Sequence, residues 1–297
     1  MNEAAIIIPH YNDPDRLRRC LSVLVPQVQD QPVEIVVVDN ASTVDLSAIK
    51  TDFPRVRFLD QPEKGPGPAR NLGVVQTTAP RLFFTDSDCV PAPDWVATAL
   101  AISPTDKITG GPVNTFDEDP PPRSGAQAFE TVFAFPFEDY VKRQKFTGTG
   151  NLITTRNVFE KTGLFAGGVF EDKDWCLRAG ALGFPVVWHP GLIVSHPTRD
   201  DFAGLCRKWK SNVRVAYSRN GAGFRDRLRW GARALIVAGS GVLHLGKVAR
   251  HPLLSRREKL AAGWTLLRLR SMRAVWMIGQ LIRRPDMRPE GRLYDDA

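Results

Sequence analysis

The sequence has few cysteines and no long hydrophobic run. Its four cysteines among 297 residues show none of the paired spacings of a zinc site, and they are too few for a disulfide scaffold. The longest uncharged run of the C-terminal part, residues 234–246, would form a helix of about 20 Å, whereas the hydrocarbon core of a bilayer is about 30 Å thick. We therefore expect a reduced, cytosolic protein without a simple transmembrane helix. The cysteines are Cys20, Cys89, Cys176 and Cys206.

Three further patterns are missing. A secretory signal peptide is not expected, because Glu3 is acidic and the apolar run over residues 4–8 is too short for one. The sequence has no internal repeat and no low-complexity tract. The loop over residues 9–13 (PHYND) lacks the glycines of a dinucleotide-binding fingerprint and those of a nucleotidyltransferase loop. A nicotinamide dehydrogenase and a nucleotidyltransferase are therefore both disfavoured.

The charge is distributed unevenly along the chain. The overall composition, 43% apolar and 24% charged, is typical of a globular protein, and the net charge is +8. Residues 1–205 hold 19 Lys and Arg against 26 Asp and Glu, whereas residues 206–297 hold 21 against 6. An acidic body with a strongly basic C-terminal part is typical of proteins that meet an anionic surface, either a membrane or a nucleic acid.

Short apolar runs alternate with helical patterns in the first hundred residues. The runs are continuous and rich in β-branched residues, which predicts buried strands, and the segments between them have apolar residues at helical spacing. Strands of this kind predict a mostly parallel sheet that is covered by helices on both faces. The predicted strands are residues 5–8, 34–38, 56–59, 81–84, 186–188 and 192–194, and the predicted helices are residues 16–25 and 69–76.

Three of these strands are followed by polar residues, at positions 11–13, 39–40 and 86–88. In open α/β sheets ligands bind at the carboxyl ends of the strands, so we expect these residues to meet at one edge. The carboxylates of Asp86 and Asp88 could hold a hard divalent cation. The alternative is a strand-end turn in which an aspartate caps the next element. A further carboxylate, Asp39, after a neighbouring strand favours the cation site.

Two other features carry candidate chemistry. Glu171, Asp172 and Asp174 lie next to a glycine-rich stretch, where a carboxylate with a raised pKa could act as a general base. The alternative is an acidic helix N-terminus favoured by the helix dipole, and both interpretations can hold together. His196 follows a predicted strand and could be a third metal ligand, because imidazole binds transition-metal cations. A strand-end histidine without a ligand is the alternative.

The basic C-terminal part contains an apolar helical pattern. Six apolar residues fall on one helical face, whereas Leu266, Leu269 and Trp276 lie off it. A basic helix that carries Trp and Leu favours an anionic lipid surface, and a helix that packs on the body or on a second subunit is the alternative. Nucleic acid is disfavoured because no reading motif accompanies the charge. The six residues are Leu260, Trp264, Leu267, Val275, Ile278 and Ile282.

Five motifs, in order along the chain, resemble the family 2 glycosyltransferases of the GT-A type. Each motif is weak by itself, but five in the family's order are highly specific, and the likeness covers about residues 4–200. The motifs are residues 6–12 (IIIPHYN), 34–42 (EIVVVDNAS), 69–73 (ARNLG), 83–91 (FFTDSDCVP) and 148–178, which ends in FEDKDWCLR.

The resemblance implies a nucleotide site. Pro9 and Tyr11 would line the nucleotide base, and Asp39 would form a hydrogen bond with it. Arg70 would lie near the nucleotide and its phosphates. Asp86 would contact the ribose or the metal.

The resemblance also implies a metal site and a catalytic base. Asp88, with Asp86, would bind Mn²⁺ or Mg²⁺, and His196 matches a metal-binding histidine that some members have. Asp172, with Glu171 beside it, matches the acidic pair that contains the catalytic base.

The resemblance thus implies an α/β GT-A fold with a Rossmann-like, mixed and mostly parallel sheet. We expect residues 1–205 to form this domain, with a nucleotide-binding half over 1–100 and an acceptor half over 101–205. Residues 206–297 would form a basic, amphipathic, membrane-associated helical extension.

The expected activity is inverting transfer of a sugar from a nucleotide-diphosphate sugar to a hydroxyl of a glycan or lipid-linked acceptor. It would serve glycolipid or surface polysaccharide synthesis at the inner face of the cell membrane. A non-catalytic module that binds sugar nucleotides, and a nucleic-acid-binding protein that uses the basic C-terminal part, are the alternatives.

Overall fold

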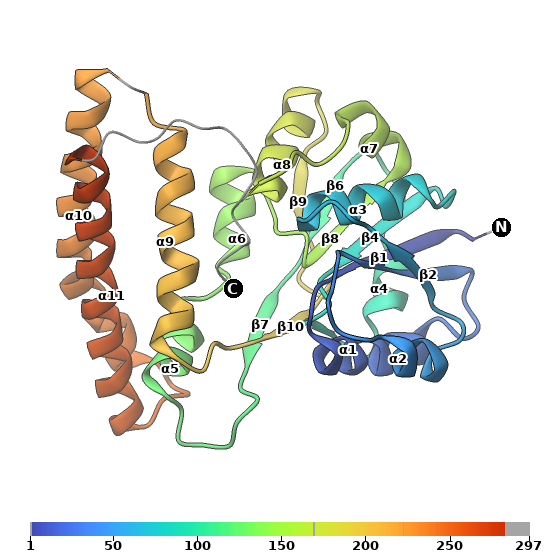
Figure 1. Cartoon of the computed structure of the whole chain (residues 1–297), viewed down its shortest axis with the longest axis horizontal. Coiled ribbons are helices and arrows are strands. Elements are labelled where there is room, and N and C mark those ends of the chain that lie inside the picture. The colour runs from blue at the N-terminus through green and yellow to red at the C-terminus, as the bar shows by residue number, and fades with distance from the viewer. Residues whose placement is uncertain (1, 169, 222, 283–297) are drawn as a thin grey trace. The chain divides into compact units, whose positions relative to one another are not determined.

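A computed structural model describes residues 2–168, 170–221 and 223–282. The chain forms two compact units, which we describe separately (Figure 1). The sheet unit contains the described residues up to 114 and residues 135–196, and the helical unit contains residues 115–134 and the described residues from 197 onward. The domain boundary near residue 205 stays a prediction.

The sheet unit is built on a mixed sheet of seven strands. β1 pairs in parallel with β2 and β4, and β2 pairs in parallel with β3. β8 is antiparallel to both its neighbours, β4 and β6, and β6 is parallel to β9, so β8 alone runs against the others. This confirms the mostly parallel sheet predicted from the sequence. In sheet order the strands are β3 (Arg57–Asp60), β2 (Val33–Asp39), β1 (Ala4–His10), β4 (Arg81–Thr85), β8 (Asn151–Thr155), β6 (Ile108–Gly110) and β9 (Val186–Trp188).

Helices cover both faces of this sheet, as expected (Figure 1). Ile6 and Ile8 of β1 lie in one core, together with residues of α1, α2 and α4. Ile7 points to the opposite face, because side chains alternate along a strand, and it lies in a second core with residues of α3, α7 and α8. The helices are α1 (Pro14–Gln27), α2 (Ser47–Asp52), α3 (Pro66–Val75), α4 (Trp95–Ala101), α6 (Phe137–Asp139), the π-helix η1 (Tyr140–Gln144), α7 (Arg156–Thr162) and α8 (Glu171–Ala181).

A second, small sheet has the order β5 (Val90–Pro91), β10 (Val194–Pro197) and β7 (Val113–Phe116). The strand predicted at residues 192–194 therefore begins and ends later than expected. The backbone carbonyl of Leu192 instead accepts a hydrogen bond from the side chain of Asn151, and the first pairing of β10 is Val194 with Pro91. Ser195 pairs with Val90, and this register places His196 beside the turn that follows β4.

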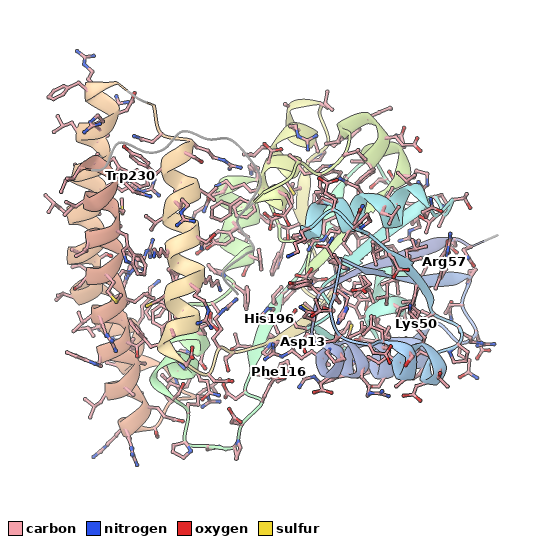
Figure 2. All side chains as sticks on the ribbon, in the orientation of Figure 1. Asp13, Lys50, Arg57, Phe116, His196 and Trp230 are labelled. Atoms are coloured by element: carbon pink, nitrogen blue, oxygen red, sulfur yellow. The ribbon has the colours of Figure 1, made fainter. Side chains whose placement is uncertain are left out.

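The helical unit consists of α5 (Gly125–Phe133), α9 (Phe202–Ser218), α10 (Phe224–Arg250) and α11 (Arg256–Ile282). Ser124 and Gln127 form a capping box at the start of α5. The buried Glu130 of α5 accepts hydrogen bonds from Arg199 and from Lys208 of α9. The indole of Trp230 in α10, labelled in Figure 2, donates to the carbonyl of Met277 in α11. The predicted helical character of the basic C-terminal part is thus present over its described residues.

Gly73 of α3 permits the close packing of this helix on β1 and β2. A Cβ atom at position 73 would lie 2.6 Å from Cγ2 of Ile7 and 3.3 Å from Cγ2 of Val38. Both neighbours are buried β-branched residues that cannot rotate away. We expect Gly73→Ala to lower the free energy of unfolding by about 1–3 kcal/mol, measured by urea denaturation.

Gly180 provides the matched control. It is exposed near the end of α8, and a Cβ atom there would have no neighbour within 4 Å. Gly180→Ala should therefore keep or raise stability, because alanine favours helix by up to about 1 kcal/mol over glycine. Equal effects of the two substitutions would contradict the packing of α3 described above.

Candidate active site

One cavity lies at the edge of the large sheet where β1, β2 and β4 end. Its volume is about 480 Å³, within the usual range of small-molecule sites. Most of the lining comes from the end of β1, from the residues that follow β1, β2 and β4, from the starts of α3 and α8, and from the residues just before β8. Because β8 runs against β4, its amino end lies at the same edge as the carboxyl ends of the others. Figure 2 labels two of the lining residues, Asp13 and His196.

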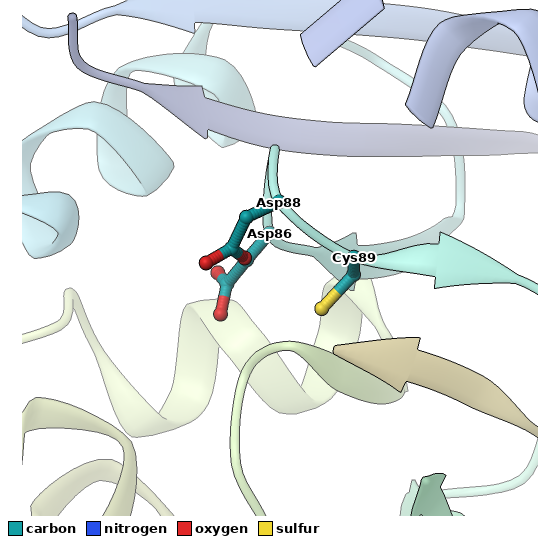
Figure 3. Close-up of side chains that lie close together, drawn as sticks. All are labelled: Asp86, Asp88 and Cys89. Carbon is teal, nitrogen blue, oxygen red and sulfur yellow. The ribbon is translucent and has the colours of Figure 1, made fainter. Parts of the chain in front are cut away.

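The turn after β4 presents two carboxylates to the cavity. The amide of Cys89 donates to the carbonyl of Asp86 over 3.0 Å, which closes the turn. Ligand atoms of Asp86, Asp88 and Cys89 all lie within 4.8 Å of one another, and Figure 3 shows the three side chains side by side. Position 150 has to be small here, because a Cβ atom on Gly150 would lie 2.9 Å from Oδ2 of Asp86.

The donor set fits a hard divalent cation. Carboxylate oxygens are the ligands that Mg²⁺ and Mn²⁺ prefer. Burial, followed by the charges of Asp88 and Asp86, raises the pKa of the Cys89 thiol well above its ordinary value, so this sulfur is a neutral and poor ligand. Nε2 of His196 lies 3.1 Å from Oδ2 of Asp88, although His196 is outside the group of three. The two aspartates are therefore the ligands that the geometry supports best.

Arg70 connects the two acidic parts of the site. Its side chain is buried in α3, with 3% of the residue exposed. One guanidinium nitrogen donates to Asp86 over 2.6 Å, and another donates to Glu171 over 2.8 Å. Burial alone would lower the pKa of Arg70, but the charges of Asp86 and Glu171 raise it overall. Arg70 is therefore a fixed positive charge inside an acidic cavity.

The start of α8 presents the second acidic pair. Phe170 precedes the helix with a left-handed φ of 66°, and Glu171 and Asp172 form its first turn. Burial, followed by the charge of Glu171, raises the pKa of Asp172 to about 7. The amide of Lys173 donates to Oδ1 of Asp172 over 2.6 Å. A carboxyl with this pKa exists in both protonation states near neutral pH, as a general base requires.

A hydrogen-bonded group holds Asp39 at the end of β2. Ser42 donates its hydroxyl to Oδ1 of Asp39, and Nδ1 of His10 lies 3.4 Å from the same oxygen. The amide of Asp13 donates to Nε2 of His10, so a neutral His10 carries its proton on Nδ1 and directs it toward Asp39. Asp39 itself is not among the residues that line the cavity, whereas its neighbour Asn40 is.

Asn40 orders the loop that leads into α3. Its side-chain amide donates to the carbonyl of Glu63 over 2.6 Å, and its oxygen accepts the amide of Gly65 over 2.5 Å. Gly65 has a φ of 132°, which is open to glycine but not to other residues, and α3 begins at the next residue. Asn40 thereby helps to place the helix that carries Arg70.

Comparisons with known proteins agree with these observations. Residues 5–165 match the model of glycosyl transferase family 2. The chain belongs to this family. The match covers more than half of the 297 residues, and it confirms the family that the five motifs indicated.

Individual relatives of this family 2 glycosyltransferase are distant. It is 26% identical to the glycosyltransferase AglE of Haloferax volcanii over 215 residues, which cover 69% of each chain. It is 30% identical to the uncharacterized glycosyltransferase YibD of Escherichia coli over 111 residues, which are 36% of this chain and 32% of YibD.

Solved structures show the same fold. Residues 1–349 of S. aureus TarS superpose with a TM-score of 0.51 and 16% identity, over 88% of this chain and 69% of that one. The complex of the same TarS fragment with UDP-GlcNAc gives a TM-score of 0.50, with 16% identity, over 90% of this chain and 72% of that one. The predicted α/β GT-A fold class is thereby confirmed.

The structure brings most of the site residues predicted for this family 2 glycosyltransferase into one cavity. Only Asp39 of the predicted set is absent from the lining, and it contacts His10, which is part of it. The roles given to these residues stay predictions. The predicted residues that do line the cavity are Pro9, Tyr11, Arg70, Asp86, Asp88, Glu171, Asp172 and His196.

Several lining residues were missed by the sequence analysis. Phe135 and Phe137 belong to a segment that matches no motif of the family, yet both line the cavity. Their rings are stacked at 5.9 Å, and the ring of Phe135 lies 4.8 Å from that of His196. The only sequence signal was the density of aromatic residues between positions 133 and 146. His10 and Lys64 were likewise given no role.

The raised pKa of Asp172 can be tested by removing its acidic neighbour. Glu171→Gln should move the midpoint of Asp172 below 7, because a like charge that favours the protonated form is lost. The midpoint can be followed from the ¹³C shift of the Asp172 carboxyl group in an NMR titration. Asp174→Asn is the control, since Asp174 is paired with Arg178 and should leave the midpoint near 7. An unchanged midpoint in Glu171→Gln would mean that burial alone sets this pKa.

Proposed function

We propose that this protein is an inverting glycosyltransferase that moves a sugar from a nucleotide-diphosphate sugar to an acceptor hydroxyl. One observation carries the proposal: the carboxylate pair Asp86 and Asp88 and a carboxyl with a pKa of about 7, Asp172, line the same cavity in a family 2 chain. The first group suits a diphosphate leaving group, and the second suits the deprotonation of a hydroxyl.

The nucleotide half of the donor would occupy the side formed by β1, β2 and α3. Pro9 and Tyr11 line this side, and we assign them to the base. Asp39, oriented by His10 and Ser42, would accept a hydrogen bond from the base. Arg70 would place its positive charge near the phosphates. Because a structural neighbour was solved with UDP-GlcNAc, uridine diphosphate sugars are the first donors to test.

Asp88 and Asp86 would hold Mn²⁺ or Mg²⁺, with His196 as a third ligand. When bound, such a cation neutralises the charge that develops on a departing diphosphate. Arg70 adds a second positive charge on the same side of the cavity through its contact with Asp86.

Asp172 would act as the general base, with Glu171 and Arg70 setting its surroundings. It takes the proton from the acceptor hydroxyl while the hydroxyl oxygen attacks the anomeric carbon. The new C–O bond forms as the bond from this carbon to the diphosphate breaks. A single displacement of this kind inverts the configuration at the anomeric carbon. A general base of this type contributes a factor of about 10²–10⁴ in rate.

The class of acceptor is proposed from the excess of basic residues after residue 205 and from membership of glycosyl transferase family 2. We assign residues 1–205 to the catalytic GT-A domain, with the acceptor bound by its second half, and residues 206–297 to a membrane-associated extension. The excess of Lys and Arg after residue 205 supports a lipid-linked or glycan acceptor at the inner face of the cell membrane. Glycolipid or surface polysaccharide synthesis is the corresponding pathway class.

Asp172→Asn should lower kcat by at least about 10²-fold and leave donor affinity within a factor of two, because the base does not contact the donor in the ground state. The wild-type rate should rise with pH with a midpoint near 7, since only the unprotonated base is active. Steady-state turnover measures kcat and its pH dependence, and calorimetric titration with the donor measures donor affinity. Asp174→Asn is the control: Asp174 lies two residues after Asp172 and is paired with Arg178, so this variant should keep activity. A parallel loss of donor binding in Asp172→Asn would contradict the assigned role.

Asp88→Asn should abolish the metal-dependent part of donor binding. Thermal unfolding with UDP-, GDP-, dTDP- and CDP-sugars, each with and without Mn²⁺ or Mg²⁺, measures this, because a ligand of the native state raises the midpoint. In the wild type we expect sugars of one nucleotide to raise the unfolding midpoint only when the metal is present. In Asp88→Asn this metal-dependent shift should be absent. A shift without any turnover would instead indicate the non-catalytic module. Salt-sensitive DNA or RNA binding without any nucleotide-sugar shift would indicate the nucleic-acid-binding alternative.

A further inference from the structure

The two long helices of the helical unit expose large apolar side chains. Phe224 of α10 is 81% exposed and Trp264 of α11 is 68% exposed. On α11 the exposed apolar residues are three, four or eleven positions apart, and on α10 Phe224, Leu228, Leu235 and Val242 are four or seven apart, so each set forms a stripe along its helix. Two more exposed residues of α10, Ile236 and Leu243, directly follow members of its stripe in sequence and widen the exposed apolar surface beside it. We call the two stripes together the apolar face. It consists of Phe224, Leu228, Leu235 and Val242 of α10 and Leu260, Trp264, Val275, Ile278 and Ile282 of α11.

Both stripes lie on the same side of the α10–α11 pair. The helices are antiparallel neighbours, because Gly231 lies against Leu281 and Gly263 lies against Leu245. The opposite side of the pair is occupied by α5 and α9: the ring of His244 in α10 lies 6.1 Å from that of Phe133 in α5, and Arg273 of α11 lies 3.8 Å from the ring centre of Trp209 in α9. Helical geometry places the stripes about a quarter turn away from the seam, on the side that α5 and α9 leave open.

The charge of the two helices selects what can cover this face. Within their 54 residues they contain twelve Lys and Arg but only two acidic residues, Asp226 and Glu258, and Glu258 is buried. A second copy of the chain would bring two such basic surfaces together, which like-charge repulsion disfavours. An anionic lipid surface offers both hydrocarbon for the stripes and counter-charge for the basic residues.

Length and composition alone would allow α10 to cross a bilayer, and α10 is the one helix among the described residues for which this holds. Its neighbour α11 argues against it. Gly241, in the middle of the uncharged run of α10, lies against Leu267 and Arg270 of α11, and Arg268 and Arg273 are close by in sequence. A crossing α10 would carry these three arginines into the hydrocarbon core, where charged side chains are strongly disfavoured.

We propose that α10 and α11 form an in-plane membrane anchor, which lays the apolar face on one leaflet of an anionic bilayer without crossing it. The basic residues near the ends of the stripes, such as Arg225 and Arg250 of α10 and Arg257 of α11, contact lipid phosphates. The inference deepens the proposed placement at a membrane by naming the surface and its mode of binding. It does not require that the protein transfers sugar.

The test is flotation of the full-length protein with vesicles of phosphatidylcholine containing 30% phosphatidylglycerol, and with pure phosphatidylcholine. We expect binding to the anionic vesicles to exceed binding to the neutral ones by about tenfold or more. The triple variant Leu235→Ser, Trp264→Ser, Ile278→Ser should lose about tenfold or more of that binding, because three membrane-facing side chains are removed. Its thermal midpoint should not fall, since all three side chains are at least 40% exposed.

A matched control replaces three exposed apolar residues of the sheet unit, Val75, Leu177 and Leu182, by Ser, and should float like the wild type. Asp172→Asn should also float like the wild type, so failure of the catalytic proposal remains distinguishable from failure of the anchor. If the triple variant of Leu235, Trp264 and Ile278 floated with the anionic vesicles as well as the wild type does, the proposal would be overturned. The proposal would also be overturned if sedimentation showed the wild type to be a dimer and the triple variant a monomer, because a second copy would then cover the apolar face.

The in-plane mode is tested separately on vesicle-bound protein. Alkaline carbonate should release the bound wild-type protein, and retention would indicate a crossing helix and overturn this mode. Brominated lipids should quench the fluorescence of the wild type more than that of Trp264→Phe, because Trp264 faces the acyl chains. Equal quenching of the two proteins would contradict the assigned face.

Discussion

The active site depends on one buried guanidinium group that holds two acidic elements together. Arg70 contacts Asp86, 16 residues away, and Glu171, 101 residues away, with hardly any of its own surface exposed. Without its charge, Asp86, Glu171 and Asp172 would face one another in a partly buried cavity, and repulsion would drive them toward protonation. Removing one partner from such a buried pair typically costs about 3–5 kcal/mol, since an uncompensated charge remains.

The position of Arg70 depends in turn on the loop before α3. Asn40 at the end of β2 holds this loop through Glu63 and Gly65, and Gly65 has a backbone conformation that only glycine adopts easily. Gly73 then lets α3 approach β1 and β2 closely. Thus a strand end, a glycine turn and a helix contact together determine where the positive charge enters the cavity. The chemistry of the site and the packing of the sheet are therefore coupled.

Much of the sheet unit could be predicted from the sequence. Continuous apolar runs predicted β1, β2 and β4, and the polar residues after them predicted the edge at which the cavity lies. The segment with Phe135 and Phe137 could not be predicted as part of the site, because it has neither regular periodicity nor a motif. The late start of β10 was also missed, since an apolar run does not reveal which backbone groups are already bonded to a side chain such as Asn151.

The sequence by itself determined which residues gather at the carboxyl edge, because parallel strands place their ends together whatever surrounds them. It also determined the basic character of the C-terminal helices. Only the tertiary structure decided that Asp172 has a pKa of about 7, that Arg70 is buried between two carboxylates, and that Leu266 and Leu269 face the core while Trp264 faces outward. Burial and local charge are set by neighbours distant in sequence, and two apolar faces of one helix look alike until packing covers one of them.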